Sequence, residues 1–170
     1  MNNQILSKIF LSLILISFSS KSFGQNQIIS KSDIWLGEYE VYLRDNLSTP
    51  VDTLIINKTK DADANKLVSK LKSDVARWNI SFKSNPKDES QEVRRFLTDE
   101  INAKNEYKEF GWEELNKKGK MNCIDGDHFF ICQSKPETLI QFNKEETYFS
   151  KTGIFGIWLH KGLVELKKIK

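Results

Sequence analysis

The sequence is short of the residues that most often reveal a function. Its 170 residues contain only two cysteines, two histidines and three prolines, and its eight glycines form no phosphate-binding loop. Two histidines are too few for a His-rich metal site, and the chain has neither a nucleophile elbow nor an HExxH zinc motif. These absences exclude the enzyme classes that short motifs identify.

The sequence also lacks an excess of charge of one sign. Lys and Arg number 26 and Asp and Glu 23, for a formal net charge of +3, and both signs are interspersed. The first 24 residues contribute Lys8 and Lys21 and no acid, so the rest of the chain is closer still to neutral. A near-neutral chain is a poor match for a polyanion. We therefore expect no nucleic-acid partner.

The longest run of apolar residues lies near the N-terminus. Lys8 precedes the run 9–16, and Ser22 and Gly24 stand at positions −3 and −1 of a cleavage site after Gly24. This order is typical of a secretory signal peptide, and the run is far shorter than the roughly 20 residues that span a bilayer. We expect a periplasmic or secreted protein that does not span a membrane. The predicted segments are a signal peptide at 1–24, a flexible lead-in at 25–33 and a single globular domain at 34–170.

The two cysteines lie close together, at Cys123 and Cys132. In an oxidising compartment this pair predicts a disulfide, worth roughly 2–3 kcal/mol in the chain-entropy model. The dipeptide Asp125-Gly126 between them is a strong hairpin signal, but a turn there would place Cys123 opposite His128. The bridge therefore requires a wider loop, centred nearer Asp127 and His128, and we favour the bridge.

Alternation of apolar and polar residues predicts strands at both ends of the domain. Trp35, Tyr39, Val41 and Leu43 share one face of the first such segment. Residues 154–159 are apolar throughout, which is typical of a strand buried on both faces. The predicted strands are 35–43, 51–57, 78–82, 121–124, 128–133, 138–142, 147–150, 154–159 and 163–168.

In the middle of the domain, the spacing of apolar residues predicts helices instead of strands. Apolar residues recur at helical intervals over 64–75, and again in a stripe formed by Val93, Phe96, Leu97 and Ile101. The second helix is expected to begin near Asp88 and to end at Phe110-Gly111-Trp112. A further helical turn is predicted at 112–117. The sequence thus predicts an α+β domain, with a curved antiparallel sheet or small β-barrel of about 7–8 strands and a two-helix segment inserted in the middle.

The densest group of polar residues falls within 123–132. Two thiols, one imidazole and two carboxylates are all potential metal ligands, but their spacing matches no known zinc pattern. His128 with Asp125 or Asp127 also resembles an acid/base pair. These three residues are the candidates for a catalytic role, in a metal-dependent hydrolase. Adjacent residues in a turn are more often only solvated, so we expect no catalytic residue, metal or cofactor.

The aromatic residues allow a second type of site. The pattern Trp35-x-Gly37-x-Tyr39 resembles the first strand of lipocalin-like barrels, with the usual order of Gly and Trp reversed. The resemblance covers five residues and transfers no site. A barrel of this type could carry a small apolar ligand, although side chains alone can also fill a small barrel. The residues that would line its interior are Trp35, Tyr39, Phe155 and Trp158.

Together these patterns favour an exported, soluble, non-catalytic binding protein. Its partner would be another protein, for example a toxin that it neutralises or an envelope component. The polar edge of the predicted helix pair is one candidate contact face, with Arg94, Arg95, Glu100 and Lys104. A small apolar-ligand carrier and a metal-dependent hydrolase that uses residues 123–132 are the alternatives.

Overall fold

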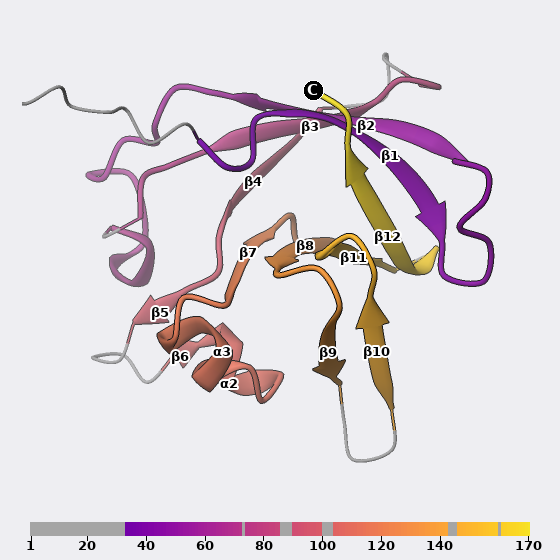
Figure 1. Cartoon of the computed structure of the whole chain (residues 1–170). Helices are drawn as coiled ribbons and strands as arrows, with labels where there is room; N and C mark the ends of the chain where they lie inside the picture. Colours follow the sequence, from indigo (N-terminus) through magenta and orange to yellow (C-terminus); the bar gives the residue numbers. More distant parts are fainter. Residues whose placement is uncertain (1–32, 73, 86–89, 100–103, 143–145, 160) are drawn as a thin grey trace, which may run out of the picture. The chain divides into compact units, whose positions relative to one another are not determined.

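Eight antiparallel strands close into a barrel (Figure 1). The computed structural model describes residues 33–170 apart from 73, 86–89, 100–103, 143–145 and 160. The predicted signal peptide and nearly all of the predicted lead-in lie outside the described residues. Barrel strands follow one another in chain order, and the last pairs with the first. The barrel is therefore an up-and-down meander that two insertions interrupt.

Seven of the eight barrel strands coincide with segments that the sequence predicts as strands, and β4 is the exception. The eight are β1 (Gly37–Leu43), β2 (Asp52–Lys58), β3 (Trp78–Phe82), β4 (Gln91–Arg95), β7 (Met121–Asp125), β8 (Phe129–Ser134), β11 (Ile154–Trp158) and β12 (Gly162–Lys168). The second insertion is the hairpin of β9 (Thr138–Gln141) and β10 (Thr147–Ser150). All nine predicted strands are confirmed, and so is the fold class.

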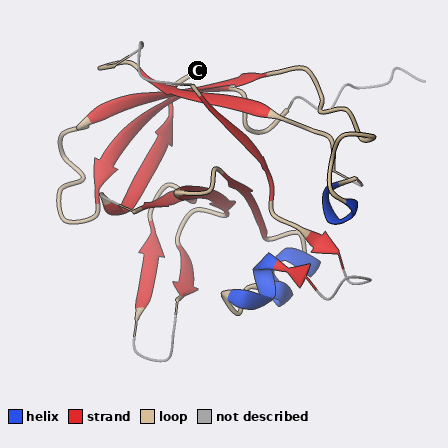
Figure 2. Ribbon diagram, turned by 180° about the vertical axis from the view of Figure 1, so that it is seen from behind, coloured by secondary structure: helices blue, strands red, loops and turns tan. Residues whose placement is uncertain are grey.

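The first insertion, between β4 and β7, contains the helices. It consists of β5 (Thr98–Asp99), β6 (Lys104–Asn105), α2 (Glu106–Glu109) and α3 (Glu113–Lys117). The predicted helical turn at 112–117 is confirmed. The short helices α2 and α3 and the β9–β10 hairpin appear on the same side of the barrel in both views (Figures 1 and 2).

Inward-facing side chains fill the barrel with a continuous apolar cluster. On β1, Tyr39 and Val41 point inward and are almost fully buried, whereas Leu43 is partly exposed. On β11, Ile154 and Trp158 belong to the same cluster. This alternation follows from the period of two along a strand.

A second apolar cluster covers the outer face of β7, β8 and β11. Phe155, Cys123 and Cys132 face outward there and pack against residues from both insertions. Trp112 at the start of α3 donates its indole N–H to the carbonyl of Gln141 on β9, at 2.8 Å. The two insertions therefore share one core, separate from the core inside the barrel.

The helix predicted at 64–75 is wrong. These residues form the loop between β2 and β3, with one 3-10 turn at Ser69–Leu71. The backbone N–H of Ala62 donates to the carbonyl of Val75 at 2.8 Å, so the loop folds back on itself. Its apolar residues are half-buried or, at Val68, exposed, and most helical stability in proteins comes from packing an apolar face.

The second predicted helix, from Asp88 to Phe110, is wrong over most of its described part, which contains strands β4, β5 and β6, and only its last turn is helical, as α2. Val93 points into the barrel, and Phe96 and Leu97 are buried outside β4. The spacing of these residues imitates one helical face. It arises instead because Val93 and Phe96 belong to two different cores on opposite sides of the wall. Residues 86–89 and 100–103 lie outside the described residues.

Candidate functional site

The hairpin of β7 and β8 brings the 123–132 residues together as a structural element. Cys123 lies directly opposite Cys132, their Cα atoms are 4.1 Å apart, and they form a disulfide. Both residues are buried. The same register places Asp127 and His128 at the tip, as the favoured bridge requires, and the alternative two-residue turn at Asp125-Gly126 does not form. Oxidised sulfurs do not act as thiolate ligands, which removes two of the candidate metal ligands.

Asp125, at the end of β7, takes part in an ion-pair network. Arg94 Nη2 on β4 donates to Asp125 Oδ2 at 2.6 Å, and the same guanidinium binds the Glu106 carboxylate through two hydrogen bonds of 2.8 and 2.9 Å. Glu106 also accepts from the backbone N–H of Leu97 at 2.8 Å. Burial raises the pKa of Asp125 above its usual value, and the nearby Arg94 only partly offsets this. Asp125 is therefore already engaged by Arg94.

His128 and Asp127 are exposed at the tip of this hairpin. Asp127 has a positive φ of 66°, which the turn demands. The His128 backbone carbonyl accepts from the N–H of Leu159 at 3.1 Å. Among the described residues, neither hydrogen bond nor ion pair joins the imidazole to Asp125 or Asp127. Nor do the described residues contain a group of three or more His, Cys, Asp or Glu that could hold a metal.

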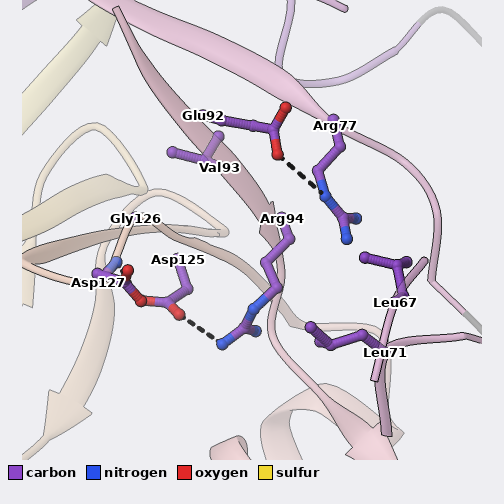
Figure 3. A pocket seen from close by; sticks show the side chains of 9 residues that line it. All are labelled: Leu67, Leu71, Arg77, Glu92, Val93, Arg94, Asp125, Gly126 and Asp127. Carbon is purple, nitrogen blue, oxygen red and sulfur yellow. Dashed lines mark hydrogen bonds and ion pairs between the residues drawn. The ribbon is translucent and has the colours of Figure 1, made fainter. Parts of the chain in front are cut away.

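A cleft of about 230 Å³ opens beside this turn, where β4 separates from β7. We call it the β4 cleft. In Figure 3 the two leucines and the Asp125–Asp127 turn lie on opposite sides, with the two arginine side chains between them. Half of the cleft wall is apolar and half is charged. The cleft is lined by Leu67, Leu71, Arg77, Glu92, Val93, Arg94, Asp125, Gly126 and Asp127.

Arg77 is the most unusual residue of the β4 cleft, because it is only 4% exposed. Its Nη1 donates to the carbonyls of Asp74 and Ala76, both at 2.8 Å, and its Nε lies 3.5 Å from Glu92 Oε1. The other terminal nitrogen, Nη2, has no acceptor among the described residues. The two N–H donors on Nη2 are therefore not used by an acceptor in the described part of the chain.

The charge of the cleft is negative. Arg77 is paired by Glu92, and Arg94 is shared between Asp125 and Glu106. Asp127 forms no ion pair within the described residues, although its charge also acts on Arg94, and it brings the carboxylates of the cleft lining to three against two guanidinium groups. A neutral or cationic group is therefore favoured here over an anion.

The predicted ligand-lining residues separate into two groups. Trp35, Tyr39 and Trp158 lie in the interior cluster, whereas Phe155 lies on the other side of the wall, in the outer cluster. Phe155 follows Ile154, which points inward, so the alternation of the strand turns it outward. The indole of Trp158 stacks on Phe129, with ring centroids 5.3 Å apart.

The sequence analysis does not identify Arg77 as a site residue. It names Arg94 as a contact residue, but on a helix that the structure does not contain. Arg94 was placed on a helix face but lies on β4, while Glu100 and the side chain of Lys104 fall outside the described residues. Arg77 directly precedes the inward-facing Trp78 of β3. No motif or spacing in the sequence at this position indicates that the arginine is buried. Only the folded arrangement of the loop reveals that it is buried.

Comparison of the chain with models of protein families, with curated proteins and with solved structures finds no match. Within the part of the chain that the structure describes, every helix is too short or too polar to cross a membrane. The candidate site therefore rests on its geometry alone.

Proposed function

We propose that the protein is an exported, non-catalytic binding protein that holds a segment of a partner protein in the β4 cleft. The observation that carries this proposal is the β4 cleft itself, where the nearly buried Arg77 lines the same hollow as Leu67 and Leu71. A hydrogen-bond acceptor on a partner could bind the Arg77 Nη2 donors, which have no acceptor among the described residues. Residues 1–24 supply the export signal in this proposal, and the disulfide is compatible with an oxidising compartment.

The chemistry of residues 123–132 supports binding over catalysis. Cys123 and Cys132 are bonded to each other, and Asp125 is held by Arg94. A hydrolase would need an acid or base positioned against a nucleophile or a water. These residues instead fix the shape of one wall of the cleft.

A partner protein also suits the cleft better than an apolar small molecule suits the barrel. Inside the barrel, Trp158 packs against both Phe129 and Phe82, with ring centroids 5.3 and 6.2 Å apart. These contacts use the aromatic surface that a carrier would offer to its ligand. The β4 cleft, in contrast, combines Leu67 and Leu71 with polar groups, as protein interfaces do.

The test is a comparison of two leucine variants. The full chain, expressed with its own leader, is used to capture partners from culture fluid and envelope extract. Leu67 lines the cleft, whereas Leu139 is 60% exposed on the β9–β10 hairpin. We expect Leu67→Asp to reduce capture of a stoichiometric partner by roughly tenfold or more, because it places a charge at the contact.

The control is Leu139→Asp, which introduces the same charge outside the cleft and is expected to keep full capture. Circular dichroism establishes that both variants are folded. Equal capture by the two variants would contradict the proposal, as would capture that depends on Leu139 alone.

A further inference from the structure

The edge of β4 is incompletely paired at the β4 cleft. On one side β4 pairs with β3 from Gln91 to Val93, and on the other it pairs with β7 only at Arg94 and Arg95. The N–H of Phe96 donates to the carbonyl of Cys123, which continues the same register beyond the strand. The pairing between β4 and β7 therefore begins at Arg94, and Glu92, two residues earlier in β4, has no partner in β7.

The alternation of an antiparallel ladder identifies the free groups. Since Phe96 directs its backbone groups toward β7, Arg94 and Glu92 direct theirs to the same side. Arg94 lies opposite Asp125, but the register would place Asp127 opposite Glu92, and Asp127 is in the turn. Among the described residues, none hydrogen-bonds the backbone of Glu92 on this side. At the cleft, the peptide N–H and C=O of Glu92 on this side are thus without a partner within the part of the chain that the structure describes.

We infer that the β4 cleft binds an extended peptide segment that pairs with β4 at Glu92 and carries a lysine or arginine. Strand addition to an open edge is a common mode of peptide recognition. A peptide carbonyl is also a neutral acceptor suited to Arg77 Nη2. This inference rests on the proposed function and specifies the partner segment.

The basic residue follows from the charges that remain. Arg77 and Arg94 are each balanced by acids, so the carboxylate of Asp127 dominates the rim. A glutamate on the segment would face net negative charge, whereas an arginine would face Asp127. The leucines of the cleft would contact the aliphatic part of the segment.

The experiment uses three capped tripeptides, acetyl-Thr-X-Thr-amide with X as Arg, Gln or Glu, titrated into the isotopically labelled protein. NMR amide shifts locate binding and give dissociation constants. We expect shifts at Glu92 and Asp127, and affinity that falls in the order Arg, Gln, Glu. A fourth peptide, N-methylated at the central Arg, lacks the N–H that pairs with β4 and is expected to bind at least about tenfold more weakly.

Two variants test the charge. Asp127→Asn keeps the size of the side chain and tolerates the positive φ, and we expect it to weaken the Arg peptide by about fivefold while leaving the Gln peptide unchanged. Glu137 is the matched control, because it is exposed and also has a positive φ of 59°. Glu137→Gln is expected to change neither peptide.

Several outcomes would overturn the inference. They are shifts outside the cleft, equal binding of the Arg and Glu peptides, full binding of the N-methylated peptide, and the absence of binding of the Arg peptide. If any of these occurs while partner capture still depends on Leu67, the inference fails and the proposed function stands. If capture does not depend on Leu67, the proposed function fails.

Discussion

The guanidinium of Arg94 and the carboxylate of Glu106 meet through two parallel hydrogen bonds, 2.8 and 2.9 Å long. Arg94 lies on β4, and Glu106 begins α2. Burial lowers the pKa of Arg94, but the hydrogen bonds and charges of Glu106 and Asp125 outweigh this effect and raise it overall. The pair therefore joins the barrel to the helical insertion, and it holds Arg94 at the β4 cleft.

The first prediction concerns this pair. Glu106→Gln keeps the shape of the side chain but removes its charge and leaves a largely buried Arg94 with Asp125 as its single carboxylate partner. We expect the free energy of unfolding to fall by about 2–3 kcal/mol, because hydrogen bonds to charged groups are among the stronger ones. Urea denaturation measures the change.

Its control is Glu114→Gln, which breaks an exposed pair with Lys118 on α3. Surface pairs contribute little, so this variant is expected to remain within about 0.5 kcal/mol of the wild type. A similar loss in the two variants would show that the buried network has no special role.

The second prediction concerns the disulfide. The double variant Cys123→Ala, Cys132→Ala should still fold, because the two apolar cores remain, but its free energy of unfolding should fall by roughly 2–3 kcal/mol in the chain-entropy model. Urea denaturation of the variant, compared with the wild type, measures the difference. Thiol labelling of the denatured, non-reduced wild type should modify neither cysteine, and two labelled cysteines would contradict the bridge.

The third prediction concerns the close contact of Gly156 with Trp158. A Cβ added to Gly156 would lie 2.2 Å from Cζ3 of the indole, so Gly156→Ala must displace Trp158 from its stack on Phe129. We expect a loss of about 1–3 kcal/mol, as for other overpacked cores, together with a change in tryptophan fluorescence.

A double-mutant cycle isolates this contact. In a Trp158→Leu background the indole is gone, so the added methyl group of Gly156→Ala should cost much less than in the wild type. An equal cost in both backgrounds would assign the effect to the backbone of β11 instead of the indole.

The strands could be predicted because each follows a rule local in sequence. Alternation in β1 reflects one core on one side of the strand. The rule failed for β4, because Val93 packs in the interior cluster and Phe96 in the outer cluster. Apolar residues that belong to two different cores are here spaced as they would be on one face of a helix.

The β4 cleft could not be predicted for a different reason. It depends on the register between β4 and β7, which leaves Glu92 without a partner in β7, although it pairs with Asn79 of β3. It also depends on how the 59–77 loop folds over Arg77. Register and loop path arise from contacts between residues far apart in the chain, and a one-residue shift would turn each side chain to the other face.

The fourth prediction concerns Glu165, a buried carboxyl group on β12. It is only 1% exposed, its Oε1 accepts from Ser150 Oγ and from the N–H of Thr152, and its Oε2 has no partner among the described residues. Burial raises its pKa from the ordinary 4.5 to about 7. Between these two values the folded protein retains a proton that the unfolded chain has released.

The free energy of unfolding should therefore fall as the pH rises from 4.5 through 7. Above pH 7, Glu165 should cause little further change. The full effect is on the order of 3 kcal/mol, at about 1.4 kcal/mol per unit of pKa shift. Glu165→Gln cannot release a proton, so it should lose this part of the pH dependence whatever its absolute stability. Urea denaturation at pH 5 and pH 8 measures both proteins, with the exposed Glu137→Gln as control. If wild type and Glu165→Gln show the same change between the two pH values, Glu165 does not titrate in this range.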